Sequence, residues 1–168
     1  QSVPRAWQVG AGGMLQPVTC RFRLLDQDHF GFEADRHDPT LPLTDIDYTV
    51  ELARKAEAGL FDSIFLADVL GLWNDVRATP FNWLEPITTL GALAGSTQRI
   101  GLIATASTTY SEPFNLARQF ASLDHISGGR IGWNIVTSWM AAAARNFGGT
   151  GQVSHADRYD RGEEFMQV

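Results

Sequence analysis

The stretch from Ser127 to Gly148, SGGRIGWNIVTSWMAAAARNFG, is the part of the chain that decides its fold. Gly128 and Gly129 permit a chain reversal, because glycine adopts positive φ at little cost. The short apolar run that follows, Arg130–Val136, contains several β-branched residues and predicts a buried strand. Toward the end of this run, the sequence changes to small polar side chains and an indole, namely Asn134, Thr137, Ser138 and Trp139.

These polar residues have two interpretations. Thr137 and Ser138 could cap a following helix, and the N-cap preference of serine and threonine alone favours that interpretation. In parallel α/β folds, however, ligands bind at the carboxyl ends of the strands. The two preceding predicted strands also end in polar residues, Asp68 after one and Thr105 and Ser107 after the other. This recurrence favours a binding site.

Upstream, short apolar runs alternate with segments of helical periodicity. Apolar residues at helical spacing follow a Thr44 or Asp45 N-cap, and Gly59 is a natural stop for this helix. Glu85-Pro86 and Glu112-Pro113 each open another helix, because proline is tolerated in the first turn and glutamate favours the helix dipole. The intervening strands are predicted at 61–67 and 99–104, and a last helix is predicted to begin near Asp157.

This order predicts an α/β fold with a parallel sheet covered by helices. On these residues alone two closures remain open, a doubly wound open sheet and a (β/α)8 barrel. A barrel typically needs about 250 residues. The 168 residues of this chain would therefore supply roughly half of one.

Composition argues against several classes of protein. Hydrophobic residues make up 44% of the chain, which is enough for a core and argues against disorder. A net charge of −6 without a basic run disfavours nucleic-acid and anionic-membrane partners, and no apolar run is long enough for a transmembrane helix. Cys20 is the only cysteine, which favours a reducing compartment. We therefore expect a cytoplasmic protein.

The polar strand ends define a candidate binding site. In a parallel sheet, one carboxylate, several hydroxyls and the amide of Asn134 would line the same edge, and such a set suits a neutral ligand rich in hydrogen-bonding groups. Metal-ligand spacing, the GxSxG motif and the P-loop motif are absent from the sequence. Each residue also has a structural interpretation. Asp68 could cap a loop, the threonines suit a strand, and His155 and Tyr159, at i and i+4, suit an exposed helix face.

Three segments, in order, resemble flavin-dependent monooxygenases of the nitrilotriacetate monooxygenase component A type. They are EPITTLGALAGSTQRIGLIATASTTYSEPFNLARQFASLDHISGGRIGWNIVTSW, AARNFG and HADRYDRGEEF. Dibenzothiophene-sulfone monooxygenase and the larger subunit of pristinamycin IIA synthase are in the same group, within the bacterial luciferase-like superfamily. The similarity covers about residues 36–168, which we predict to be the N-terminal half of a barrel. Residues 1–35 are then a separate segment with a possible first strand at Val18–Leu25.

The resemblance implies a (β/α)8 barrel that binds reduced FMN at the carboxyl ends of its strands. A separate NAD(P)H:flavin reductase would supply the reduced flavin, and a small organic substrate would be oxidised by O2 through a flavin C4a-(hydro)peroxide. No catalytic residue and no metal ligand is assigned. By motif position, the implied cofactor-binding residues are Asp68, Thr105, Ser107, Asn134, Thr137, His155 and Tyr159.

Members of this group are longer than 168 residues. The resemblance therefore implies that the chain is part of a longer protein. It also implies that the full-length protein is a homo-oligomer, either a dimer or a tetramer. Two alternatives remain at this point: a relative that uses the deazaflavin F420 for hydride transfer, and an inactive barrel half that binds no flavin.

Overall fold

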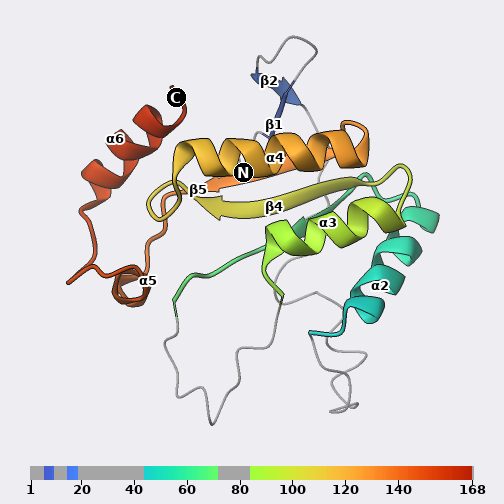
Figure 1. Cartoon of the computed structure of the whole chain (residues 1–168), viewed down its shortest axis with the longest axis horizontal. Coiled ribbons are helices and arrows are strands. Elements are labelled where there is room, and N and C mark those ends of the chain that lie inside the picture. The colour runs from blue at the N-terminus through green and yellow to red at the C-terminus, as the bar shows by residue number, and fades with distance from the viewer. Residues whose placement is uncertain (1–5, 10–14, 19–43, 72–83, 168) are drawn as a thin grey trace.

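The computed structural model describes residues 6–9, 15–18, 44–71 and 84–167, and in the described part of 46–136 helices and strands alternate as predicted (Figure 1). The helices are α2 (Ile46–Ala58), α3 (Pro86–Ser96), α4 (Pro113–Ser127), α5 (Ala141–Asn146) and α6 (His155–Phe165). The strands are β1 (Ala6–Val9), β2 (Leu15–Val18), β3 (Ser63–Leu66), β4 (Gly101–Ser107) and β5 (Ile131–Val136). In the described ranges, no helix is long and apolar enough to cross a membrane.

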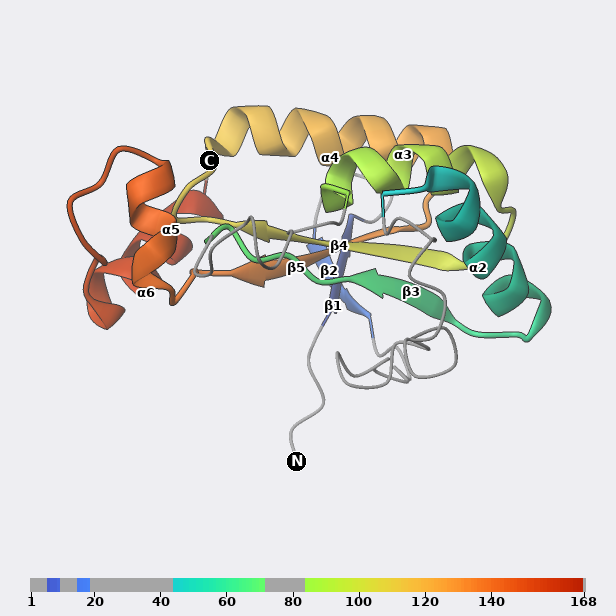
Figure 2. The same ribbon diagram turned by 90° about the horizontal axis from the view of Figure 1, so that it is seen from below.

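The strands β3, β4 and β5 form a parallel sheet in that order. Helices α2, α3 and α4 all lie on the same face of this sheet (Figure 2). A doubly wound sheet carries helices on both faces, whereas the wall of a (β/α)8 barrel carries them on its outer face only. Of the two closures that the sequence left open, the structure therefore favours the barrel wall.

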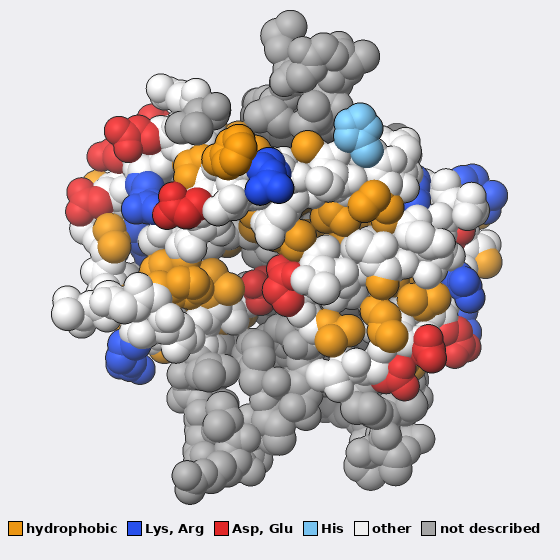
Figure 3. Space-filling view, viewed as in Figure 1, with side chains coloured by type: hydrophobic (Ala, Val, Ile, Leu, Met, Phe, Trp, Pro, Cys, Tyr) orange, Lys and Arg blue, Asp and Glu red, His pale blue; other side chains and the backbone are white. Residues whose placement is uncertain are grey.

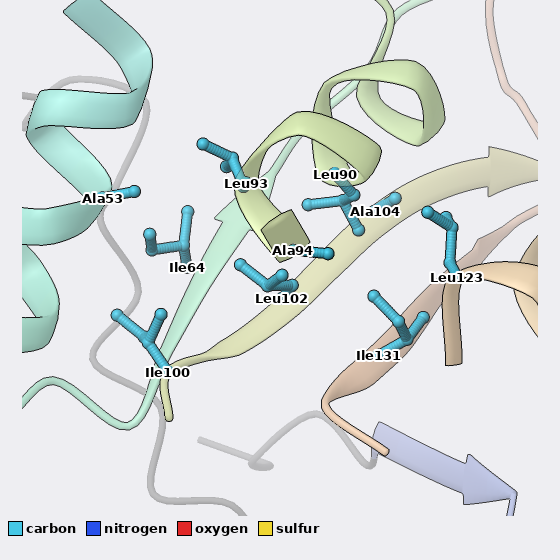
Figure 4. Packing of buried hydrophobic residues seen from close by; sticks show 10 residues of the cluster. All are labelled: Ala53, Ile64, Leu90, Leu93, Ala94, Ile100, Leu102, Ala104, Leu123 and Ile131. Atoms are coloured by element: carbon cyan, nitrogen blue, oxygen red, sulfur yellow. The ribbon is translucent and has the colours of Figure 1, made fainter. Parts of the chain in front are cut away.

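The core fills the space between the helix layer and the sheet. Successive side chains of a strand point to opposite faces, and one set of alternate positions meets the helices. Figure 4 shows this packing among Ala53 of α2, Leu90, Leu93 and Ala94 of α3, Leu123 of α4, and Ile64, Ile100, Leu102, Ala104 and Ile131 of the sheet and its edge. Thr105, Ser107 and Asn134 occupy the other alternate positions. They therefore lie on the sheet face that these helices leave uncovered.

Helix ends follow the predicted capping chemistry. Asp45 caps α2 by accepting hydrogen bonds from the backbone N–H groups of residues 47 and 48. Glu85 caps α3 in the same way, with Pro86 in the first turn. Helix α4 ends at Gly128, whose φ of 69° is left-handed and is adopted most easily by glycine. The sequence therefore specifies these three helix boundaries locally.

Three features differ from prediction. Strand β4 extends to Ser107, so that Thr105 and Ser107 lie within the strand and not after it. Helix α6 begins at His155, two residues before the predicted start, because Ser154 is its N-cap. Helix α5 was not predicted. It contains four consecutive alanines, and alanine has the highest helix propensity of any residue type.

An antiparallel pair of strands, β1 and β2, was also not predicted, and β1 lies beside β5. The predicted first strand at Val18–Leu25 shares only Val18 with β2, and its remaining residues, which include Cys20, lie outside the described part of the chain.

On the outer face of the molecule, hydrophobic side chains are interspersed with charged ones over α3 and α4 (Figure 3). Two of the exposed hydrophobic residues of α4 are Phe114 and Ile126.

Glu57 joins the end of α2 to the start of β4. Its Oε1 accepts hydrogen bonds from the backbone N–H groups of Arg99 at 2.5 Å, Ile100 at 3.0 Å and Gln98 at 2.9 Å. These bonds, with those from Arg99 and Ile100 foremost, lower the pKa of Glu57 from 4.5 to about 2. The folded chain therefore stabilises the ionised form of the Glu57 carboxyl group.

We expect Glu57→Gln to lower Tm at neutral pH, and the difference from wild type to shrink as pH falls from 4.5 toward 2. A carboxylate with a lowered pKa stabilises the fold above its unfolded pKa and loses this contribution as pH falls through the folded value. Glu51→Gln is the matched control, because Glu51 forms only an exposed pair with Lys55. Thermal unfolding followed by circular dichroism measures both variants. A Tm difference for Glu57→Gln that stays constant with pH would contradict the prediction.

Candidate functional site

The carboxyl ends of β4 and β5 are joined by hydrogen bonds between polar side chains. Asn134 Nδ2 donates to Thr105 Oγ1 at 2.9 Å, between residues that face each other in the sheet register. Further along, Ser138 Oγ donates to Ser107 Oγ at 2.7 Å. Thr105 and Ser107 are buried, and the other two residues are half-buried. We call Thr105, Ser107, Asn134 and Ser138 the strand-end cluster. The structure therefore brings together three of the predicted site residues, Thr105, Ser107 and Asn134.

Thr137 immediately follows β5, at the corner where the chain leaves the sheet, and it is held there through its backbone. Its carbonyl accepts a hydrogen bond from Thr109 Oγ1 at 2.7 Å. Its methyl group faces α6, because a Cβ on Gly162 would lie 3.5 Å from Thr137 Cγ2. Neither Thr137 nor Ser138 caps the next helix: the N-cap of α5 is Met140, without a side-chain bond. The capping interpretation of this corner is therefore wrong.

Asp68 lies just beyond the carboxyl end of β3. It is half-buried, and its Oδ1 accepts a hydrogen bond from the backbone N–H of Val69 at 2.8 Å. This is the local loop interaction that the sequence allowed for. Because β3 and β4 are parallel neighbours, Asp68 belongs to the same edge of the sheet as the strand-end cluster. Its contact with a ligand stays a prediction.

Helix α5 connects the loops that follow β3 and β4. Asn146 Nδ2 donates to the carbonyl of Leu70 at 2.8 Å, and the ring of Phe147 stacks on Tyr110 with centroids 4.5 Å apart. Gly71 is buried against this helix, since a Cβ there would lie 3.3 Å from the backbone nitrogen of Ala143. The carboxyl edge of the sheet is therefore one packed region.

His155 and Tyr159 lie in the first two turns of α6, which Figure 1 shows beyond the carboxyl end of the sheet. Their rings stack with centroids 4.5 Å apart, and both residues are exposed. The neighbouring face of α6 is fixed to the strand ends: Arg158 Nη1 donates to the carbonyl of Ser138 at 2.7 Å, and Arg161 Nε to that of Thr108 at 3.2 Å. The structure thus brings the two rings together, but at a place separate from the strand-end cluster.

The strand-end cluster consists of hydroxyls and one amide. Each of these groups can both donate and accept hydrogen bonds, and none carries a charge. Among the described residues, no group of His, Cys, Asp and Glu could hold a metal ion. The cluster can therefore bind and orient a neutral polar ligand. Two residues of this region, Ser138 and Arg158, were not among the predicted site residues, and only the unusual polarity of the strand end pointed to Ser138.

Comparison with known proteins identifies the family. The model of the family described as luciferase-like monooxygenase matches residues 28–168. N-acetyl-S-(2-succino)cysteine monooxygenase of Bacillus subtilis (strain 168) is 53% identical over 123 residues, which are 73% of this chain and 28% of that protein. Nitrilotriacetate monooxygenase component A of Aminobacter aminovorans is 50% identical over 137 residues, which cover 74% and 30% of the two chains.

A solved structure agrees with these relatives. Riboflavin lyase, whose structure contains modified FMN and the substrate riboflavin, is 38% identical with a TM-score of 0.67, and the match covers 73% of this chain and 30% of that one. The chain thus spans less than a third of the length of each of these proteins. Together with a parallel sheet covered by helices on one face, these matches show that the chain belongs to the luciferase-like monooxygenase family.

Proposed function

We propose that the protein is a flavin-dependent monooxygenase that binds reduced FMN at the strand-end cluster and uses O2 to oxidise a small organic substrate. A separate NAD(P)H:flavin reductase supplies the reduced flavin. The observation that carries this proposal is the hydrogen bond between Asn134 and Thr105, which fixes an amide and a hydroxyl on the helix-free face of the sheet. In (β/α)8 barrels, active sites lie at the carboxyl ends of the strands.

The chemistry of the cluster fits a flavin ring. The pyrimidine edge of isoalloxazine alternates carbonyl and N–H groups, so it needs neutral partners that donate and accept. Among the described residues, the Asn134 side chain bonds only to Thr105 and uses one amide N–H for it, so that its Oδ1 and its second N–H can serve a ligand. Ser107 Oγ accepts from both Ser138 Oγ and the backbone of Thr109, so its own proton remains to be donated.

The chain's own residues bind, orient and shield the cofactor. When bound, reduced FMN supplies the two electrons that activate O2, so that one oxygen atom enters the substrate and the other leaves as water. Asn134 and Thr105 hold the ring edge, and burial of Thr105 and Ser107 keeps water from that part of the site. We place Asp68 and Thr137 along the same edge. We place His155 and Tyr159 beside the ribityl phosphate, where their exposed rings are accessible to it.

The names of the two relatives reported above favour one class of substrate. N-acetyl-S-(2-succino)cysteine and nitrilotriacetate are both polycarboxylates that carry a sulfur or nitrogen atom between carboxyl-bearing groups. We propose a substrate of this class, oxidised beside its heteroatom. The alternative is an enzyme that transfers a hydride with F420, and an assay of cofactor specificity distinguishes it from the flavin-dependent monooxygenase.

The test uses the native gene product with a purified flavin reductase, NADH and O2. Nitrilotriacetate, N-acetyl-S-(2-succino)cysteine and dibenzothiophene sulfone are compared as substrates. Product mass must be followed together with O2 consumption, because reduced flavin reacts with O2 without an enzyme. We expect FMN-dependent and reductase-dependent turnover of the polycarboxylates, in which one oxygen atom of O2 enters at the carbon beside the heteroatom and the carbon–heteroatom bond then breaks, giving a carbonyl product that carries this oxygen and an amine or thiol. Absence of any such product, or turnover with F420 and without O2, would contradict the proposal.

A further inference from the structure

Ser138 turns the chain out of β5 in a conformation that is unfavourable for it. Its φ is 48°, in the left-handed region that residues with a Cβ seldom adopt. Such residues persist where the surrounding structure fixes them. Two hydrogen bonds do so here: Ser138 Oγ donates to Ser107 Oγ at 2.7 Å, and Arg158 Nη1 donates to the Ser138 carbonyl at 2.7 Å. The corner is thus held by β4 on one side and by α6 on the other.

Arg158 is buried without the partners that a buried charge ordinarily has. Its exposed fraction is 6%, and its Nε has no hydrogen-bond partner in the described part of the chain. Arg130, in the same chain, donates five hydrogen bonds from its guanidinium group. Burying a charge with few partners is unfavourable, and an apolar side chain of similar length fills the same space without that penalty. Packing therefore does not explain an arginine at this position.

The position of Arg158 connects the two parts of the predicted cofactor site. On α6 it immediately precedes Tyr159 and lies one turn after His155. From α6, its guanidinium donates a hydrogen bond to the carbonyl of Ser138, which follows Thr137. The Ser138 hydroxyl in turn donates to Ser107. A shift of Arg158 would therefore change both the corner after β5 and the distance from this corner to the two rings.

We infer that Arg158 is a positioning residue: by holding the Ser138 carbonyl, it sets the geometry in which the 137–138 corner and α6 together receive the flavin. The link to flavin rests on the proposed function, whereas the clamp on the corner does not. The inference predicts a separation of effects. Removing the guanidinium should loosen the corner and weaken flavin binding while leaving the stability of the fold nearly unchanged.

The experiment compares Arg158→Met, Arg158→Lys and wild type in the native gene product. Arg118→Met is the matched control, because Arg118 lies on the exposed side of α4 over the Phe114 ring. Three quantities are measured for each protein: Tm, hydrogen exchange of the peptide that covers residues 133–141, and the Kd for FMN. Hydrogen exchange needs no cofactor, so it tests the clamp separately from the proposed function.

For Arg158→Met we expect Tm within about 4 °C of wild type, faster exchange in residues 133–141, and a Kd for FMN raised by about tenfold or more, because the flavin would have to order the loosened corner when it binds. Arg158→Lys should recover part of both losses, because an ammonium group can donate to the same carbonyl. Arg118→Met should match wild type in all three measurements.

Unchanged exchange and unchanged FMN affinity in Arg158→Met would overturn the inference. An unfolded Arg158→Met would also overturn it, because Arg158 would then be needed for the fold as a whole. A wild-type protein that binds no FMN would contradict the proposed function instead, and hydrogen exchange would still decide whether Arg158 holds the corner.

Discussion

Arg130→Ala is expected to lower the free energy of unfolding by about 3 kcal/mol, because it removes several hydrogen bonds from a charged group at once. Arg130 stands just before β5. Its Nε donates to the carbonyl of Ser127 at 2.8 Å, and its Nη1 to Thr97 Oγ1 at 2.9 Å and to the Ile100 carbonyl at 2.8 Å. Its Nη2 donates to the carbonyls of Ala94 at 2.9 Å and Thr97 at 3.1 Å. One side chain thus joins the ends of α3 and α4 to the start of the sheet.

Urea unfolding at neutral pH measures this effect. Arg130→Lys should lie between the alanine variant and wild type, because an ammonium group cannot reach all five acceptors at once. Arg118→Ala, on the exposed side of α4, is the control and should change the free energy of unfolding by less than about 0.5 kcal/mol. If Arg130→Ala also stays below this value, the guanidinium network does not stabilise the fold as described.

Asn134→Leu is expected to raise the Kd for FMN and lower turnover, each by about ten- to a hundredfold, because it removes an amide that the ring edge would contact. Leucine has the same branching and the same number of side-chain heavy atoms as asparagine, so the structural effect should be small. Loss of the bond to Thr105 should lower the free energy of unfolding by about 1 kcal/mol. Asn115→Leu, on the exposed side of α4, provides the matched substitution outside the site.

Fluorescence titration with FMN and reductase-coupled turnover measure the two effects. Thr105→Val should show the same pattern more weakly, since it removes one hydroxyl and leaves the Asn134 amide in place. An Asn134→Leu protein that binds FMN as tightly as wild type would exclude this amide from the cofactor site.

Local chemistry in the sequence predicted most of the helix layer. Asp45, Glu85 and Gly128 define helix ends through capping and positive φ, which act within a few residues. The shared edge of Thr105 and Asn134 was also predictable, because parallel strands bring their carboxyl ends together. The choice between an open sheet and a barrel was not, because it depends on which face of the sheet each helix covers.

The remaining features depend on tertiary contacts that no local pattern encodes. In HADRYDRGEEF, charged residues dominate, and this pattern suggests an exposed helix. Arg158 is nevertheless buried, because its side chain reaches from α6 to the carbonyl of Ser138, which lies just after β5. The antiparallel pair β1 and β2 consists of two strands of four residues each, which are too short for a clear alternation of polar and apolar side chains.

The most direct test of the cofactor site is a crystal structure of the native gene product with FMN bound. We expect the isoalloxazine ring to lie on the helix-free face of the sheet, with its pyrimidine edge within about 3.5 Å of the Asn134 amide and the Thr105 hydroxyl. A flavin that is bound elsewhere, with no atom of its ring near the carboxyl ends of β4 and β5, would contradict it.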